Sequence, residues 1–199
     1  MSNIVKFAKP YSFEGTEYTE VDLSGMDKLT IQDMIDIQKN LANELASLAA
    51  LEATTSFAQE MATKASGKPV EFFKLMPRAK IKQVQTAILL SLNAKTKSDP
   101  AKHIVKFDAP YTYNGEEKAD IKGKTFESVD LSGVGELNTM SESMAENRLA
   151  GYGFTPVNTG HNYAYVCIIA TGYPVDFFTG LPLCEAAKLR DAVDADFFE

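Results

Sequence analysis

The sequence contains the same opening twice. The segment IVKFAKPYSFEG begins at residue 4, and IVKFDAPYTYNG begins at residue 104. Domains typically contain on the order of 100 to 150 residues, so a 199-residue chain with a repeated opening is expected to hold two small modules. This repeat limits the fold strongly, because related copies of a module must bury equivalent side chains.

Each opening predicts a β-hairpin. Apolar residues alternate along both segments, and each turn carries a glycine, Gly15 in the first copy and Gly123 in the second. The returning strands lie in GTEYTEVDLSG at 15–25 and GKTFESVDLSG at 123–133. The second copy carries an insertion, EEKADIKG at 116–123. We expect this insertion to be a polar loop that simply lengthens the hairpin tip.

The third repeated block extends over two helices. GKPVEFFKLMPRAKIKQVQTAILLSL at 67–92 aligns without a gap with GYPVDFFTGLPLCEAAKLRDAVDADF at 172–197. Both copies predict a helix that ends at a capping glycine, a loop restrained by proline, and a new helix that begins near a second proline. One apolar face recurs in this last helix; its residues are Ile81, Val84, Ile88 and Leu92 in the first copy, and Ala186, Leu189, Val193 and Phe197 in the second.

The regions between these blocks are predicted to be helical. In the first copy, Thr30 is expected to cap one helix, and Ser56 with Gln59 resembles a capping box for another. The inner face of the first of these helices is predicted to carry Met34, Ile37, Leu41, Leu45 and Leu48. The second copy predicts a helix over 139–150, a break at 151–162 and a short apolar helix over 163–171.

These elements predict an α+β, mostly helical fold of two tandem modules, each a β-hairpin followed by two or three α-helices. The polar, proline-bearing segment AKTKSDPAK at 94–102 suits a boundary between them. We therefore assign residues 1–95 to the first module, 96–102 to a linker and 103–199 to a second, diverged copy.

Composition excludes several classes of protein. The net charge of −7 argues against nucleic-acid binding, and the acidic excess lies in the second half, where residues 101–199 carry 8 basic and 15 acidic side chains. The longest apolar stretches fall far short of the roughly 20 residues that span a bilayer, and the first residues lack the pattern of a signal peptide. We expect a cytoplasmic protein that binds neither membrane nor nucleic acid.

Catalytic, metal and cofactor sites are not indicated. The two cysteines, Cys167 and Cys184, are interpreted as buried free thiols, and His103 and His161 as linker and loop residues. A pairing of His161 with Cys167 as base and nucleophile remains an alternative. The acidic run with Asp191, Asp194 and Asp196 lacks the pattern of a calcium loop. Asp22 and Asp130, which recur in VDLSG, are expected to make turn hydrogen bonds.

The candidate partner-binding residues are the repeated Phe-Phe pairs, Phe72 with Phe73 and Phe177 with Phe178. They are predicted to lie in loops between helices, where one ring of a pair is typically core and the other can reach outward to a partner.

The order of elements in residues 4–92, and more weakly in 104–198, resembles the tail assembly chaperones of long-tailed bacteriophages. The resemblance rests on KPYSFEGTEYTEVDLSGMDKLT, followed by a long helix and the third repeated block. It implies a non-enzymatic protein that binds the tape measure protein while tail tube protein is recruited. The protein would act in the host cytoplasm and be absent from the mature virion.

A duplicated module also suits this role, because a long amphipathic client helix needs apolar grooves at intervals. Leu89 and Leu90, beside the apolar face of the first module, become Asp194 and Ala195 in the second. We expect the first module to offer the apolar contact and the acidic second module to maintain solubility. Self-association is a further expectation. The alternatives are a structural tail or baseplate adaptor of the virion, and an enzyme acting through Cys167, His161 or the C-terminal acids of the second half.

Overall fold

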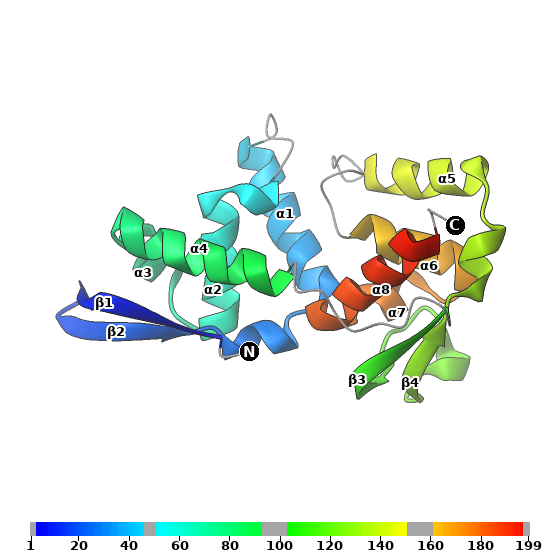
Figure 1. The fold of residues 1–199 in the computed structure, drawn as a ribbon, viewed down its shortest axis with the longest axis horizontal. Helices are drawn as coiled ribbons and strands as arrows, with labels where there is room; N and C mark the ends of the chain where they lie inside the picture. Colours follow the sequence, from blue (N-terminus) through cyan, green and yellow to red (C-terminus); the bar gives the residue numbers. More distant parts are fainter. Residues whose placement is uncertain (1–2, 46–50, 93–102, 151–160, 197–199) are drawn as a thin grey trace.

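The computed structural model describes residues 3–45, 51–92, 103–150 and 161–196 (Figure 1). Its fold is α+β and mostly helical, as predicted, with two small antiparallel hairpins that are each followed by helices. The first module contains β1 (Ile4–Phe13), β2 (Thr16–Asp22), the 3-10 helix η1 (Ser24–Lys28), α1 (Ile31–Leu45), η2 (Leu51–Ala53), α2 (Thr55–Ser66), α3 (Val70–Lys74) and α4 (Arg78–Leu92). The second contains β3 (Ile104–Thr112), η4 (Ala119–Ile121), β4 (Thr125–Asp130), η5 (Ser132–Glu136), α5 (Thr139–Ala150), α6 (His161–Thr171), α7 (Val175–Thr179) and α8 (Leu183–Asp196). The predicted linker lies outside the described residues.

The two hairpins share one register. Val5 pairs with Val21 in the first sheet, and Val105 pairs with Val129 in the second. Both ladders shift register at the same place, between Lys6 and Tyr11 in β1 and at the corresponding positions of β3. Both copies have therefore retained this register shift as well as the pairing.

The third repeated block adopts the same backbone course in both modules. α2 and α6 end at glycines in the left-handed conformation, Gly67 with φ 68° and Gly172 with φ 66°, as the sequence predicted. The segments with the Phe-Phe pairs were predicted to be loops, but they form the short helices α3 and α7, which follow Pro69 and Pro174. Proline fixes its own backbone φ angle close to the helical value, so a proline immediately before a helix favours helix formation there.

Equivalent aromatic rings form the centre of each module. In the first, Phe72 packs edge-on against Tyr11 and Tyr18, with centroid distances of 5.0 and 4.9 Å. In the second, Phe177 packs in the same way against the matching rings of β3 and β4, at 5.3 and 5.0 Å. Edge-to-face contacts at these distances are favourable. The repeat therefore extends from sequence to side-chain packing.

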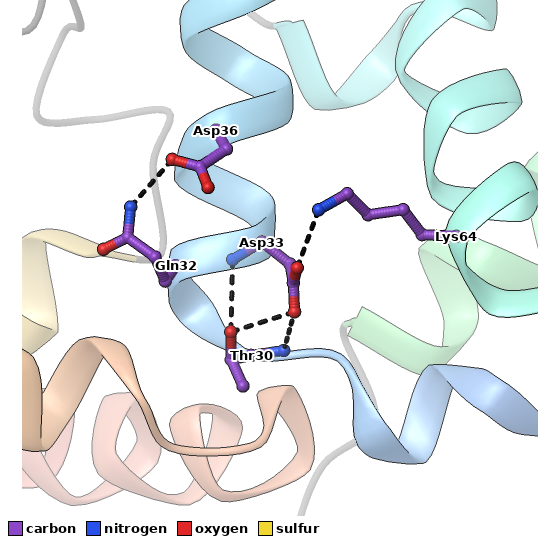
Figure 2. A network of polar contacts seen from close by, with 5 residues as sticks. All are labelled: Thr30, Gln32, Asp33, Asp36 and Lys64. Carbon is purple, nitrogen blue, oxygen red and sulfur yellow. Dashed lines mark hydrogen bonds and ion pairs between the residues drawn. The ribbon is translucent and has the colours of Figure 1, made fainter. Parts of the chain in front are cut away.

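Thr30 caps α1, as predicted, and Figure 2 shows the network around it. The hydroxyl of Thr30 accepts from the backbone N–H of Asp33 at 3.2 Å, while the Asp33 carboxylate accepts from the backbone N–H of Thr30 at 2.9 Å. Lys64 of α2 donates to the same carboxylate at 2.7 Å. Burial raises the pKa of Asp33, but the hydrogen bonds from Lys64 and Thr30 outweigh it and hold the pKa below its usual range.

Two other helix starts differ from the prediction. α2 is capped by Thr54, whose hydroxyl accepts from the backbone N–H of Phe57 at 3.1 Å, so the assignment of the cap to Ser56 with Gln59 is wrong. α6 begins at His161, two residues before its predicted start. Both differences are local, because several polar residues near a helix start can serve as its cap.

Burial follows the predicted apolar faces where the side chains are described. Met34, Ile37 and Leu41 of α1 are buried, while Leu45 and Leu48 lie outside the described side chains. In the last helices, Ile81, Val84, Ile88, Leu189 and Val193 are buried, Leu92 and Ala186 are half-buried, and Phe197 is not described.

The insertion at 116–123 is not a simple polar tip. Ile121, in η4, is buried, and so is Tyr113, which precedes the insertion. The Asp176 carboxylate of α7 accepts from the Tyr113 hydroxyl at 2.6 Å and from the backbone N–H groups of Glu116 and Glu117 at 2.7 and 3.1 Å. The inserted segment is therefore attached to α7 by its backbone, which its polar composition did not reveal.

This attachment predicts a pH-dependent contribution to stability. Burial raises the pKa of Asp176, but the hydrogen bonds from Tyr113, Glu117 and Glu116 outweigh it and leave the pKa below its ordinary value. A carboxylate with a depressed folded-state pKa stabilises above its unfolded pKa of about 3.9, and the effect is lost as pH falls through the folded value. We expect Asp176→Asn to lower the free energy of unfolding by about 1–2 kcal/mol at pH 7, with a difference that shrinks below about pH 4.

Urea unfolding between pH 3 and 7 measures this difference. Asp120→Asn is the matched control, because Asp120 lies in the same insertion with its side chain exposed, and we expect no comparable loss. An Asp176→Asn protein that is as stable as wild type at pH 7 would contradict the attachment.

The two modules contact each other through α1 and the loop before α8. The first amide of α1, on Ile31, donates to the carbonyl of Leu181 at 3.1 Å, and the first amide of α8, on Leu183, donates to the carbonyl of Leu29 at 2.8 Å. Figure 1 shows the start of α8 beside α1 and the end of α4. Buried residues of both modules belong to one apolar core.

Candidate partner-binding surface

The four phenylalanines predicted to contact a partner lie in the core. Phe72, Phe73, Phe177 and Phe178 are all 0% exposed. The prediction that one ring of each pair reaches outward is wrong, because α3 and α7 are single short helices packed between the hairpin and the longer helices. Both rings of each pair therefore face apolar neighbours, and they stack edge-on at 5.1 Å within each pair.

The two leucines predicted from α4 differ in exposure. Leu90 is 66% exposed, while Leu89 is half-buried. The buried face of α4 carries Ile81, Val84 and Ile88, and Leu90 follows Ile88 by two residues. Two residues correspond to about 200° around a helix, so Leu90 points away from the core. It is the sequence-predicted site residue that presents an apolar side chain to solvent.

Sequence reasoning identified none of the other exposed large apolar residues, which among the described residues are Ile4, Leu75, Ile104, Met140 and Met144. Three of these lie on or beside helices. Leu75, after α3, is 71% exposed, and Met140 and Met144 of α5 are 71% and 51% exposed. The methionines are four residues apart and therefore share one face of the helix. No local sequence signal marked these methionines, because their exposure depends on which elements pack against α5.

Of the two candidate catalytic residues, Cys167 has a described side chain, and its surroundings do not activate the thiol. Cys167 is buried, and burial raises the pKa of its thiol well above the usual range, which disfavours the nucleophilic thiolate. His161 is the first residue of α6, six residues before Cys167. The described part of the chain holds no group of three or more His, Cys, Asp or Glu residues that could bind a metal ion.

Cys184 is exposed, which corrects the expectation that both thiols are buried. It is the second residue of α8, beside Leu183 at the module contact. The residue as a whole is exposed, but its sulfur is partly buried. This partial burial, together with the nearby carboxylates of Glu185 and Asp27, raises the pKa of the thiol, so the thiol is protonated at neutral pH.

Asp22 and Asp130 make the predicted turn hydrogen bonds. Each carboxylate accepts from the backbone N–H two residues later, on Ser24 at 2.8 Å and on Ser132 at 2.9 Å. These bonds from the serines hold the pKa of both aspartates below its usual range. The recurring carboxylates are therefore engaged in folding the chain after each hairpin.

An ionic cluster joins α8 to β3, in which Lys188 and Glu185 are buried and the Asp108 side chain is exposed. Lys188 lies 3.0 Å from the carboxylate of Glu185 and 2.7 Å from that of Asp108, and Glu185 also accepts from the backbone N–H of Asp108 at 3.0 Å. Burial lowers the pKa of Lys188, but the two carboxylates outweigh it and raise the pKa above its usual value. Lys188 also donates to the backbone carbonyl of Lys106 at 3.2 Å, so the cluster links α8 to the β3 backbone.

No helix in the described residues combines the length and apolar character needed to cross a bilayer. Comparison with known proteins adds no assignment: neither a family model, nor a curated protein, nor a solved structure was found to match this chain.

Proposed function

We propose that this chain is a non-enzymatic assembly chaperone of a bacteriophage tail. It would bind the tape measure protein, keep that long helical chain soluble and help to recruit tail tube protein in the host cytoplasm. The proposal starts from the resemblance of the duplicated module to tail assembly chaperones, and the observation that carries it is the exposure of Leu90 on α4.

Leu90 suits such a client for a physical reason. An amphipathic helix exposes apolar side chains in solution, and burying a leucine against another apolar group contributes about 1.5–3 kcal/mol. The buried face of α4 holds the module together through Ile81, Val84 and Ile88, so its opposite side can accept a client without disturbing the core. The division of roles between modules is less sharp than expected, since α5 also exposes Met140 and Met144.

The proposal predicts that Leu90→Asp weakens capture of the tape measure protein by about tenfold or more, because a carboxylate would have to be desolvated against the client. The measurement is co-expression of the full chain with a tape measure protein from the same genome, followed by quantification of the soluble complex. Leu90→Met is the matched control, since it preserves the apolar contact and should retain capture.

Two outcomes would contradict the proposal. Equal capture by wild type and Leu90→Asp would remove α4 as the client surface. Mass spectrometry of purified particles provides the second, since a stoichiometric amount of this chain in the mature virion would favour the structural tail or baseplate component instead.

A further inference from the structure

The insertion in the second hairpin occupies a surface that the first module leaves open. Phe13 and Thr16 are joined by two residues, 14–15, in the first hairpin, whereas the equivalent Tyr113 and Lys124 are joined by ten, 114–123. The longer connection extends over the start of α7, and the short turn of the first hairpin has no counterpart to it. The repeat therefore contains the same surface twice, once with a chain segment bound to it and once without.

Three hydrogen bonds hold the inserted segment on α7. The Asp176 carboxylate accepts from the backbone N–H groups of Glu116 and Glu117 at 2.7 and 3.1 Å, and the Glu117 carboxylate accepts from the backbone N–H of Val175 at 3.0 Å. Ile121, in η4, is the buried apolar residue of the segment. The second module therefore binds a loop through two consecutive backbone amides, a carboxylate and one apolar side chain.

The equivalent residues are less covered in the first module. Tyr113 is fully buried, whereas Phe13 is only partly buried and packs on Phe72 with a centroid distance of 5.2 Å. Asp176 is half-buried, whereas its counterpart Glu71, next to Phe72 on α3, is exposed. Figure 1 shows the tip of β1 and β2 pointing away from the second module. The ring of Phe13 and the carboxylate of Glu71 are therefore accessible to another molecule.

The Glu71 carboxylate can accept the hydrogen bonds that Asp176 accepts. Within the described part of the chain, the Glu71 side chain forms neither a hydrogen bond nor an ion pair. Phe13 also lacks the hydroxyl with which Tyr113 donates to Asp176 at 2.6 Å. Hydrogen bonds from backbone amides to a carboxylate are stronger than those between neutral groups. A carboxylate at this place without a donor of its own therefore suits a partner that supplies the donors.

We propose that Phe13 and Glu71 form a binding surface for a loop of a partner protein, here named the open tip surface. The loop presents two consecutive backbone N–H groups to the Glu71 carboxylate, as the inserted segment presents them to Asp176, and it buries one apolar side chain beside Phe13. A carboxylate repels the phosphates of nucleic acids and of anionic membranes, so the surface suits a polypeptide. This inference does not depend on the tail chaperone function.

The inserted segment supplies the probe that tests this proposal. A cyclic peptide with the sequence of residues 113–124 presents the same two amides. When it is titrated into isotope-labelled full-length protein, we expect it to shift the NMR signals of the Phe13 and Glu71 amides, with a dissociation constant of roughly 1 mM or below. A peptide with the same residues in scrambled order should shift neither signal.

Glu71→Gln isolates the contribution of the carboxylate. We expect it to weaken peptide binding by about fivefold or more, because a neutral acceptor replaces a charged one. Its melting temperature should equal that of wild type, since the Glu71 side chain forms no bond within the described part of the chain. Glu20→Gln is the matched control and should leave binding unchanged, because Glu20 is exposed and lies opposite Lys6 at the other end of the same hairpin.

A graft provides the converse test. Residues 114–123 in place of residues 14–15, combined with Phe13→Tyr and Glu71→Asp, rebuild the covered surface in the first module and should abolish peptide binding. Binding that Glu71→Gln or the graft leaves unchanged would overturn the proposal, and so would the absence of shifts at about 5 mM peptide. The same shifts on concentrating the protein alone, or on adding a single-stranded oligonucleotide, would identify another copy or nucleic acid as the occupant and would also overturn it.

Discussion

Replacing Phe72 by alanine is expected to lower the free energy of unfolding by about 3–5 kcal/mol, the usual cost of deleting a buried aromatic ring. Its ring is fully buried and packs edge-on against Tyr11, Phe13, Tyr18 and Phe73, with centroid distances between 4.9 and 5.2 Å. Because these neighbours come from two strands and a helix, they cannot all move into the space that the ring leaves.

Urea unfolding followed by circular dichroism measures this loss, and small domains have only about 5–15 kcal/mol of stability in total. Phe177→Ala is expected to cost a similar amount, because Phe177 occupies the equivalent position in the second module. Leu75→Ala is the control, since an exposed side chain changes stability by roughly 0.5 kcal/mol or less. A loss below about 1.5 kcal/mol for Phe72→Ala would show that the ring is not part of a packed core.

The second large effect is expected at two glycines that lie against backbone atoms. A methyl group added at Gly25 would meet the carbonyl oxygen of Ala65 at 2.0 Å, and one added at Gly133 would meet that of Ala170 at 2.5 Å. The added methyl group would force η1 away from α2 in the first case and η5 away from α6 in the second. Overpacking typically costs about 1–3 kcal/mol, and we expect Gly25→Ala to reach or exceed the upper value, with Gly133→Ala somewhat below it.

Gly135→Ala provides a matched control in the same short helix as Gly133. No atom lies within 4 Å of a methyl group added there, and the corresponding residue of the first module is Asp27, so a side chain fits at this position. Its melting temperature should stay close to that of wild type. Equal melting temperatures for Gly133→Ala and Gly135→Ala would contradict the close packing of η5 against α6.

Much of the fold could be predicted because the repeat shows most patterns in two copies, so each copy supports the interpretation of the other. The hairpins, the capping glycines Gly67 and Gly172, and the apolar faces of α1, α4 and α8 depend on residues close together in the chain. Local backbone preference and apolar periodicity report such features directly. The turn hydrogen bonds of Asp22 and Asp130 were predicted for the same reason, since donor and acceptor are two residues apart.

The site could be predicted only in part. Leu90 was identified because its distance from the apolar face of α4 can be counted along a helix. The Phe-Phe pairs were misjudged, because an aromatic ring in the core and one at a partner surface have the same sequence signature. The exposure of Leu75, Met140 and Met144 depends on whether other elements pack against them. The residues next to them in the sequence do not reveal this.

The sequence by itself determined that there are two modules, which elements each contains and which helix faces are apolar, because these follow from short-range geometry and a repeated pattern. The tertiary structure alone decided that Asp176 holds the inserted segment, that Phe72 and Phe177 are core residues, and that the start of α1 meets the loop before α8. Each of these depends on contacts between residues that are far apart in the chain, such as Tyr113 with Asp176, Phe126 with Phe177, and Leu29 with Leu183. Such contacts depend on how whole elements pack, and periodicity along the chain carries no record of that packing.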